Sequence, residues 1–514
     1  MAVVVVVLAI GGVGAGLITL AARDGKDDPP QATVQTDVKP AQGQPKMRNP
    51  AAAAGVPAKA PACKGRAVRP GADVQAALDA AGERAGERAT ICFAKGTYRL
   101  PKALRPLDGQ KLIGAPGALL TGARPLSGWA RSGSAWVATA DLPSDPRPFG
   151  ECADGTGTAC QYANLVLRDG KPLQRVTEEG ALRKGTFFQD YAGDRVLVGD
   201  NPAGHRLEVA IGRSAVVANA TGVTIQGFVI QGFATPAQGG TILANGSGWT
   251  IRNNEVRYNH GLAINTVKGG KVIANHVHHN GQMGLGGQTG GLVEGNEINN
   301  NNTAGFSYGW EAGGTKWVET EGLIVRRNYS HDNIGPGLWT DINNNNTTYE
   351  GNLVTGNADF GIHHEISYKA VIRNNEITGN GNQERDVGYG GAGIRIAASP
   401  GVRITGNVLR GNANAIMLLQ QDRSDDSATR GPHELANITV TGNDIAISQG
   451  AIGLMQDVGD RTLFERSRNI RFDANTYRLS RINGDWFAWH DELMSRSGWR
   501  ELGQDRTGKF LPLS

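Results

Sequence analysis

An asparagine recurs at almost regular intervals through the C-terminal half of the chain. Consecutive copies are 21 to 24 or 32 to 36 residues apart, and they are Asn254, Asn275, Asn296, Asn328, Asn352, Asn375, Asn407, Asn443 and Asn475. Most repeats read Val/Ile-x-x-Asn-x-Val/Ile, then a polar turn, then Gly with an apolar residue. One such repeat cannot bury its apolar side alone, whereas stacked repeats share one continuous core. The recurrence therefore predicts a solenoid with its asparagines in register at one turn.

The composition and the pattern inside each repeat indicate the kind of solenoid. The Leu-x-x-Leu-x-Leu frame of leucine-rich repeats is absent. A content of 73 glycines and only 6% aromatic residues fits many turns between short strands. We therefore predict an all-β chain, a right-handed parallel β-helix over residues 216–480, with Gly227 in the asparagine position one coil earlier. The longer intervals predict insertions of about ten residues.

The ends of a solenoid need covers, because each would expose a sheet edge and an apolar core. Residues 63–119 should form an N-terminal cap and the first coils, with Asp73 as the N-cap of a short helix over 73–78. A strand over 89–93 and a turn over 96–98 should follow. Residues 481–514 should close the other end. There we expect Trp486, Trp489 and Trp499 to pack on the last coil rather than to bind a ligand.

Residues 120–215 interrupt the repeat. They contain strand-like runs over 164–167 and 195–198, separated by Gly, Pro and Asp turns. We predict a small inserted β-rich subdomain.

The N-terminal segment indicates export. Residues 2–22 are uncharged and mostly apolar or small, which is long enough to span a bilayer. The run ends in Ala21 and Ala22, so a signal peptide cleaved near Ala22 is an equal alternative to an uncleaved membrane anchor. Residues 23–62 are rich in Pro, Ala, Gln and Lys, which predicts a disordered linker or tether. Both alternatives place the remainder outside the cell or on the outer face of a membrane.

The four cysteines agree with export. Of three connectivities, the local pairs Cys63–Cys92 and Cys152–Cys160 are the simplest. A zinc site is the alternative, but the chain has no Cys-x-x-Cys pair. The net charge is only +4 with no block of like charge in the body, so nothing indicates a nucleic-acid partner.

Two neighbouring repeats share a frame that places an acid before an isoleucine. They read Gly337-Leu338-Trp339-Thr340-Asp341-Ile342 and Gly361-Ile362-His363-His364-Glu365-Ile366. Asp341 lies 13 residues after Asn328, and Glu365 lies 13 after Asn352, so the two acids should be neighbours on stacked strands. If Leu338 and Ile362 point inwards, both carboxyl groups point outwards to solvent.

The register sets a distance between these carboxyl groups. Neighbouring strands lie about 4.8 Å apart. Retaining glycosidases hold their two carboxyls about 5–5.5 Å apart, whereas inverting ones need about 6.5–9.5 Å. Two like charges this close also raise one pKa, which leaves one group as proton donor and one as nucleophile. The alternative is a solvated surface pair, which would be repulsive and would add nothing to stability.

The surroundings of the pair favour a binding site for sugar. Trp339 and His363 occupy the first outward position of the two coils, and Arg395 occupies it on the next. Trp339 could offer a platform on which a sugar ring stacks. Glu311 and Lys316 lie in an inserted loop one coil earlier and could orient substrate, or could pair with each other as a loop brace.

Other candidate residues have ordinary structural explanations. His364 should point inwards as a hydrogen-bonded core histidine. The insertions around 381–392 and 420–434 could wall a cleft or be solvated loops, and they carry Arg385, Asp386, Gln420, Gln421 and Asp422. His276, His278 and His279 are too close in sequence, on alternating faces, to indicate a metal site. We therefore predict no metal and no cofactor.

The chain resembles the right-handed β-helix carbohydrate-active proteins over roughly residues 63–480, and more specifically the β-helix glycoside hydrolases that include retaining β-xylosidases. The resemblance rests on three stretches, which are residues 71–78, residues 165–172 with 199–202, and the pair Leu338-Trp339-Thr340-Asp341 and His364-Glu365-Ile366-Ser367. In those xylosidases an Asp in a Trp-x-Asp strand is the nucleophile and a Glu one coil later is the acid/base. The resemblance assigns these roles to Asp341 and Glu365. Ile366-Ser367-Tyr368 stands where a Val-Asn-His type sequence is usual, so xylose as the substrate does not follow.

Three functions are compatible with the sequence. The first is an extracytoplasmic retaining glycoside hydrolase, acting as a monomer on a poly- or oligosaccharide. The second is a polysaccharide lyase on the same scaffold, with Lys316, Arg395 or His363 as the base. The third is a non-catalytic glycan-binding or cell-wall structural protein, because a fold alone does not fix a function.

Overall fold

The computed structural model describes residues 48–59, 61–82, 90–144, 146–288, 290–382, 387–423 and 428–513, all within one compact unit. The apolar run 2–22 and residues 23–47 of the expected linker lie outside them. Residues 48–59 of that linker lie against the repeat, because Ala51 is buried and the Gly55 N–H donates to the Ala274 carbonyl at 2.9 Å. Among the described residues, no helix has the length and apolar character needed to cross a membrane.

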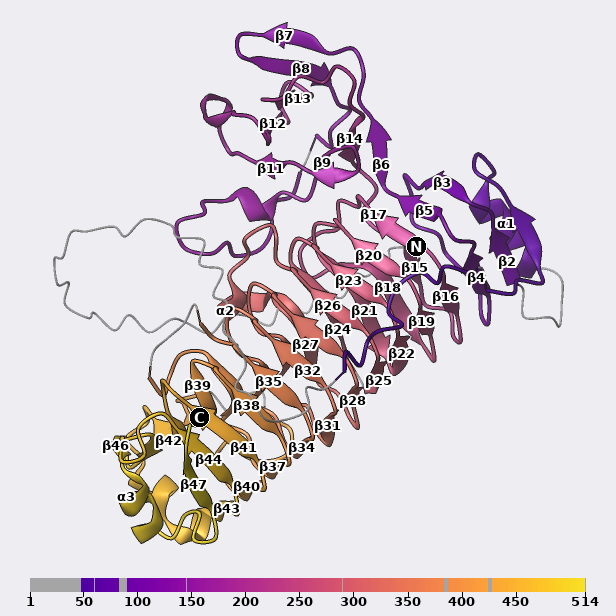
Figure 1. Cartoon of the computed structure of the whole chain (residues 1–514). Helices are drawn as coiled ribbons and strands as arrows, with labels where there is room; N and C mark the ends of the chain where they lie inside the picture. The colour runs from indigo at the N-terminus through magenta and orange to yellow at the C-terminus, as the bar shows by residue number, and fades with distance from the viewer. Residues whose placement is uncertain are drawn as a thin grey trace. The chain divides into compact units, whose positions relative to one another are not determined.

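The chain winds through three long sheets, here called sheets A, B and C, and successive coils add one strand to each (Figure 1). Sheet A has 13 strands, in the order β1 (Arg66–Val68), β2 (Thr90–Phe93), β4 (Lys111–Gly114), β16 (Thr224–Gln226), β19 (Thr250–Arg252), β22 (Gly270–Ile273), β25 (Gly291–Glu294), β28 (Ile324–Arg326), β31 (Thr347–Glu350), β34 (Ala370–Arg373), β37 (Val402–Thr405), β40 (Ile438–Thr441) and β43 (Ile470–Asp473). All its strand pairs are parallel, as a solenoid of one hand requires.

Sheet B also has 13 strands, which are β3 (Gly96–Arg99), β5 (Ala118–Thr121), β17 (Val229–Gln231), β20 (Glu255–Arg257), β23 (His276–His278), β26 (Glu297–Asn299), β29 (Tyr329–His331), β32 (Leu353–Thr355), β35 (Glu376–Thr378), β38 (Val408–Arg410), β41 (Asp444–Ile447), β44 (Thr476–Leu479) and β47 (Lys509–Pro512). Its last strand comes from the expected C-terminal cap, so the stack continues past residue 480.

Sheet C has 12 strands, which are β15 (Val216–Ala218), β18 (Gly240–Ser247), β21 (Leu262–Lys268), β24 (Met283–Gln288), β27 (Gly313–Val318), β30 (Leu338–Asp341), β33 (Ile362–Glu365), β36 (Ala392–Ala397), β39 (Asn414–Gln420), β42 (Ile452–Gln456), β45 (Phe487–Trp489) and β46 (Glu492–Met494). The final pair, β45 with β46, is antiparallel, which ends the stack. Inward side chains of all three sheets form one continuous apolar core.

The predicted asparagines stack as a buried ladder at the turn between sheets A and B. Asn352 donates both its backbone N–H and its side-chain amide to Oδ1 of Asn375, each at 2.9 Å. Gly227 does not hold the equivalent place, because the Phe228 N–H donates to Oδ1 of Asn254 at 3.1 Å. Gly227 instead takes the left-handed turn conformation, with φ +85°, one residue before the ladder position.

A second ladder, which the sequence analysis missed, stacks at the turn between sheets B and C. It lies five residues after the first and comprises Asn259, Asn280, Asn301, Asn333, Asn357, Asn380 and Asn412. Its side chains bond to one another and to carbonyls of the preceding coil in the same way. Two ladders fix the register of sheet B at both ends of each strand.

The N-terminal end is covered as the sequence predicts. The helix α1 (Val74–Gly82) follows Asp73, whose Oδ1 accepts the Ala76 N–H at 3.0 Å, and its buried residues pack over β1 and β2. The stretch predicted as a turn over 96–98 is instead strand β3. The reason is Tyr98, whose ring is buried in the core while its hydroxyl donates to the Val68 carbonyl at 3.0 Å.

The C-terminal end is closed by the expected tryptophans. Trp486, Trp489 and Trp499 are buried in the core of the last coils, Trp499 on the helix α3 (Arg496–Glu501). Asp505 terminates the first ladder, since its Oδ1 accepts from Asn475 at 3.0 and 3.1 Å and its Oδ2 accepts the Tyr477 hydroxyl at 2.6 Å. A buried carboxylate therefore ends a column of amides.

The stretch 120–215 carries two small sheets. One has the order β10 (Lys171–Pro172), β9 (Val166–Arg168), β14 (Leu207–Ala210) and β6 (Ala123–Pro125), and the other β11 (Gln174–Arg175), β12 (Thr186–Asp190), β13 (Arg195–Val198), β8 (Ala135–Thr139) and β7 (Ala130–Ser132). They enclose an apolar cluster of their own, with Val166, Phe187, Val196 and Val209. The remaining helical turns are α2 (Tyr308–Glu311), η1 (Ala159–Gln161), η2 (Glu179–Ala181), η4 (Arg461–Phe464) and η5 (Arg466–Arg468).

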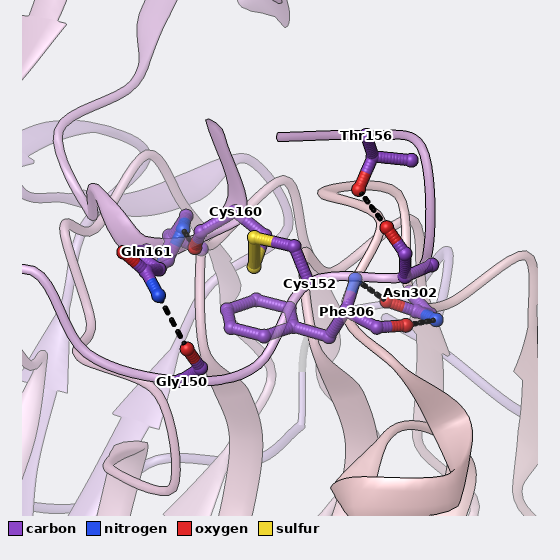
Figure 2. Close-up of a disulfide and its surroundings, with 9 residues drawn as sticks. Gly150, Cys152, Thr156, Cys160, Gln161, Asn302 and Phe306 are labelled. Carbon is purple, nitrogen blue, oxygen red and sulfur yellow. Dashed lines mark hydrogen bonds between the residues drawn. A yellow bond between two sulfur atoms is a disulfide. The ribbon is translucent and has the colours of Figure 1, made fainter. Parts of the chain in front are cut away.

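Both expected disulfides, Cys63–Cys92 and Cys152–Cys160, are present. Figure 2 shows the second one beside the ring of Phe306. Cys152 forms an antiparallel bridge with Phe306, and Asn302 holds both backbone polar groups of Phe306, at 2.9 and 2.8 Å. Because α2 begins two residues after Phe306, the disulfide loop of the insertion buttresses the start of that helix.

Candidate active site

The outer face of sheet C carries the residues predicted from the repeat frame. Trp339 and His363 are paired positions on β30 and β33, and His363 pairs with Arg395 on β36. Lys316 occupies the same outward row on β27, one coil earlier, because Trp317 pairs with Thr340. Lys316 therefore lies on a strand and not in an inserted loop. Strand alternation directs these four side chains to the same side of the sheet.

Asp341 and Glu365 are direct neighbours on β30 and β33, in the predicted register. Both carboxyls lie on the outer face, but they do not face open solvent, because the residues are only 6% and 7% exposed. The loops that cover this part of sheet C bury them. His364, between them in the frame, points inwards, where its ring nitrogens contact the Thr340 hydroxyl at 2.7 Å and the Tyr368 carbonyl at 2.8 Å.

Each carboxylate has its own cationic partner. The Lys316 ammonium lies 3.0 Å from Oδ2 of Asp341, and the Arg423 guanidinium lies 2.9 Å from Oε1 of Glu365. Burial raises the pKa of Asp341, the charge of Glu365 raises it further, and Lys316 opposes both, with a net value of about 6. Burial lowers the pKa of Lys316, but Asp341 and Glu311 outweigh it, so that pKa is raised and the ammonium stays charged.

Trp339 is not an open stacking platform. The Lys316 ammonium lies 4.3 Å from the centre of its ring, and the His363 ring stacks on it with centres 5.6 Å apart and planes 12° apart. Because Lys316 and His363 come from the strands on either side of β30, they cover opposite faces of the indole. Trp339 is 4% exposed and lines the cavity described next.

A cavity of about 350 Å³ opens beside Glu365, and Asp341 lies next to it without being one of its lining residues. Strand residues and loop residues line it together, and they are Tyr308, Gly309, Pro336, Trp339, Asp359, Phe360, His363, Glu365, Tyr389, Gly390, Arg395, Gln421 and Arg423. Tyr389, Gly390, Gln421 and Arg423 come from the two insertions expected to wall a cleft. A larger hollow of about 590 Å³ between residues 105–108 and 217–220 has no pair of carboxyls.

Several buried polar atoms at this site have no hydrogen-bond partner among the described residues. They are Nε1 of Trp339, Oδ1 of Asp341, both ring nitrogens of His363 and Nε of Arg395. Burial together with Arg395 and Arg423 holds the pKa of His363 well below its usual value, so its ring is neutral at pH 7. Buried polar groups in native proteins are usually satisfied, so a cluster of unsatisfied ones suits a polar ligand.

Some sequence candidates lie outside this arrangement. Glu311 accepts a hydrogen bond from Gln238 at 2.7 Å and does not line the cavity, nor does it pair directly with Lys316. Gln420 is a brace, since it contacts the His433 carbonyl and the Leu435 N–H. Asp422 is exposed. Arg385 and Asp386 lie outside the described residues.

Arg423 is the main residue that sequence reasoning missed. It lies in a loop without a repeat, so no frame predicts its partner. Its charge and its position two residues after Gln421 were the only signals. The ion pair with Glu365 shows why the insertion matters to the site.

Comparison with known proteins gives the fold. The family described as right handed beta helix region matches residues 239–409 and 311–445. Among solved structures, XylC in complex with xylose has a TM-score of 0.62 at 17% identity, covering 78% of this chain and 80% of that one. The A-module of the mannuronan C-5 epimerase AlgE4 from Azotobacter vinelandii has a TM-score of 0.46 at 15% identity, and the match covers 83% of this chain and 97% of that one. The polygalacturonase of Erwinia carotovora has a TM-score of 0.41 at 10% identity, and the match covers 85% of this chain and 95% of that one.

No sequence among the curated proteins matches this chain. The identities to the solved structures are too low to transfer a function. The similarity to XylC and the family match confirm the right-handed parallel β-helix that the repeat predicts.

Proposed function

We propose that the protein is an extracytoplasmic carbohydrate-active enzyme, a retaining glycoside hydrolase. The observation that carries the proposal is the register-matched pair of Asp341 and Glu365, held on the outer face of sheet C beside a cavity. Strands about 4.8 Å apart place two such carboxyls near the roughly 5–5.5 Å of retaining enzymes. Two disulfides support a location outside the cytoplasm.

The proposed reaction has two displacements. Asp341 attacks the anomeric carbon while Glu365 gives its proton to the glycosidic oxygen, so the C–O bond to the leaving group breaks and a glycosyl ester forms. Glu365 then takes a proton from water, whose oxygen attacks the same carbon and releases Asp341. Each displacement inverts the carbon, so the product keeps the configuration of the substrate.

The two cations give each carboxyl an electrostatic partner through this cycle. Lys316 contacts only one oxygen of Asp341, Oδ2, and the other oxygen, Oδ1, has no partner among the described residues. Oδ1 is therefore the oxygen proposed to attack. Arg423 contacts Oε1 of Glu365 from the loop side, where it can pair with the carboxylate that forms once Glu365 has given its proton to the leaving group.

Sugar hydroxyls are the groups that fit the unsatisfied atoms around the pair. The Trp339 and Arg395 N–H groups can donate to a hydroxyl oxygen, and a neutral His363 can both donate and accept. A site built to bond hydroxyls rejects ligands that lack them, because its own polar groups are then left buried without partners. The cavity volume lies within the range of roughly 300–1,000 Å³ typical of small-molecule sites.

The test uses the full chain with a panel of aryl glycosides, aryl xylosides first, since XylC was solved with xylose. Glu365→Gln should slow hydrolysis most with poor leaving groups, because an activated aryl group needs little acid assistance. Azide should rescue Glu365→Ala and give a glycosyl azide of retained configuration, read by nuclear magnetic resonance. An inverted product, or full activity in both variants, would reject the proposal.

A polysaccharide lyase is the second candidate, and one observation favours it. Arg395 and Arg423 both line the cavity, where two guanidiniums could neutralise a uronate carboxylate. His363 would then be the base, since its ring is neutral and has a lone pair, whereas Lys316 is held as a charged ammonium. Unsaturated uronide products, detected by ultraviolet absorbance from acidic polysaccharides, would favour the lyase over the hydrolase.

A further inference from the structure

The outer face of sheet B carries a second cluster of ionisable side chains, formed by Glu255, His276 and His278. Glu255 on β20 is the paired neighbour of His276 on β23, and His278 follows two residues later on the same strand. The sequence analysis set these histidines aside as lying on alternating faces. That was wrong for this pair, because Val277 between them points into the core and both histidines point outwards.

The three side chains converge. One ligand atom of each lies within 4.8 Å of those of the other two, and the ring centres of His276 and His278 are 4.1 Å apart. A tetrahedral zinc ion with bonds of about 2.0–2.2 Å holds its ligand atoms about 3.4 Å apart. Small rotations of side chains on rigid, hydrogen-bonded strands would therefore close the site.

Neighbouring residues orient both rings as outer-shell groups do at metal sites. Nε2 of His276 lies 2.9 Å from the amide oxygen of Asn299, which fixes the proton there and leaves Nδ1 to bind a metal. Nδ1 of His278 lies 2.8 Å from Nδ1 of His279, and its Nε2 points at Glu255 from 3.2 Å. In each ring one nitrogen is held by a neighbour and the other faces the cluster.

One neighbouring charge opposes the binding of a cation at this cluster. Arg257 pairs with Oε1 of Glu255 and competes with any cation. The contacts of Arg257 and His278 both use Oε1, so Oε2 is the oxygen that a cation can bind while Arg257 keeps its contact.

We propose that Glu255, His276 and His278 form a binding site for a divalent transition-metal ion of the Zn²⁺ class, with water in the fourth position. Two imidazole nitrogens and one carboxylate oxygen are a ligand set that zinc uses, whereas Ca²⁺ and Mg²⁺ prefer oxygen alone. On binding, the ion takes the place of the contact between Nε2 of His278 and Glu255, and the neutral ring carries its proton on Nδ1. The ion would then join strands β20 and β23 on a face other than that of the carboxylate pair.

The competing explanation is a hydrogen-bonded cluster with no affinity for metal, in which His278 simply donates to Glu255. The two differ in whether the protein binds a stoichiometric metal ion. Chelator-treated, tag-free full chain should bind one Zn²⁺ per molecule in isothermal titration calorimetry. Co²⁺ in place of Zn²⁺ should give the intense visible bands of a tetrahedral site.

Matched variants separate this site from others on the protein. His276→Gln and His278→Gln should each weaken Zn²⁺ binding at least tenfold, and Glu255→Gln should do so while keeping a hydrogen bond to His278. His331→Gln, two strands away on the same face of sheet B, and His363→Gln, on sheet C, should bind Zn²⁺ like the parent. Circular dichroism confirms that each variant is folded. No stoichiometric Zn²⁺ binding by the parent, or an equal loss in His331→Gln, would overturn the proposal.

Discussion

The protein buries two groups of polar side chains, which differ in whether their hydrogen-bonding atoms have partners. In the ladders every amide is engaged, as for Asn375, which accepts twice from Asn352 and donates to Asn407 and to the Tyr349 carbonyl. Around Asp341 and Glu365, several buried polar atoms have no partner among the described residues. A satisfied network stabilises the fold, whereas an unsatisfied one raises the free energy of the empty site and is relieved by a ligand. The contrast separates residues for stability from residues for binding.

The same contrast appears along single rows of sheet C. The outward row that holds Lys316, Trp339, His363 and Arg395 continues as Met417, and the row of the two acids continues as Ala397 and Leu419. Met417 and Leu419 join an outer cluster with Phe360 and Met455. An outward position on sheet C therefore does not by itself make a residue part of a binding site. The residues that the covering loops place over that position also determine it.

The largest expected effect is the loss of the nucleophile. Asp341→Asn should lower kcat at least about 10⁴-fold, because an amide cannot form the glycosyl ester. Steady-state hydrolysis of an aryl glycoside measures it, with circular dichroism to verify the fold. A loss below about tenfold would place the chemistry elsewhere on the helix.

Removing an asparagine from a ladder should lower stability and leave activity nearly unchanged, which is the reverse of the effect of Asp341→Asn. Asn375→Ala removes the acceptor of the buried Asn352 N–H and the side-chain donor to the Tyr349 carbonyl, and it should destabilise the neighbouring coils by about 2–4 kcal/mol, with kcat nearly unchanged at low temperature. Unfolding of a repeat array need not be two-state, so hydrogen exchange of β32 and β35 is the measurement. Thr378→Ala, half-buried on β35, is the control and should change exchange little. Equal protection in both variants would contradict the role of the ladder.

Acid should switch off the site before it harms the ladder. The pKa of Asp341 is raised to about 6, and a nucleophile must be ionised. The rate should therefore fall about tenfold per pH unit below pH 6, while the uncharged ladder amides do not titrate. A pH profile of kcat/KM measures this. Activity that instead falls as the pH rises above 6 would mean that Asp341 acts as the acid and Glu365 as the nucleophile.

The predictable part of the structure is the part that repeats. The spacing of Asn328 and Asn352 predicted the register of Asp341 and Glu365, because each coil copies the geometry of the one before. The second ladder could also have been found, since Asn357 and Asn380 keep a constant offset of five residues from the first. The ion pair of Arg423 could not have been predicted, because it depends on how a loop that does not repeat folds over the sheet. The covering of Trp339 could not have been predicted either, because it depends on where the long Lys316 side chain lies.

Two buried tryptophans allow the contrast between satisfied and unsatisfied polar groups to be tested on a single N–H group. The indole N–H of Trp249 donates to the Ala220 carbonyl at 2.6 Å, whereas the indole N–H of Trp339 has no partner among the described residues. Phenylalanine lacks this N–H. Trp249→Phe should therefore remove the donor to the half-buried Ala220 carbonyl and cost about 0.5–1.5 kcal/mol in addition to the lost ring volume, with no change in KM.

Trp339→Phe should leave the free energy of unfolding closer to that of the parent, because the lost N–H bonds nothing in the empty protein. It should raise KM or lower kcat/KM about three- to tenfold, which is the worth of one hydrogen bond to a sugar hydroxyl. Thermal unfolding of both variants, with and without a saturating sugar, is the measurement. The stabilisation by sugar should shrink in Trp339→Phe and stay at the parent value in Trp249→Phe. The opposite pattern would mean that the unsatisfied atoms around Trp339 do not bind the ligand, and the distinction between the two groups of buried polar side chains would fail.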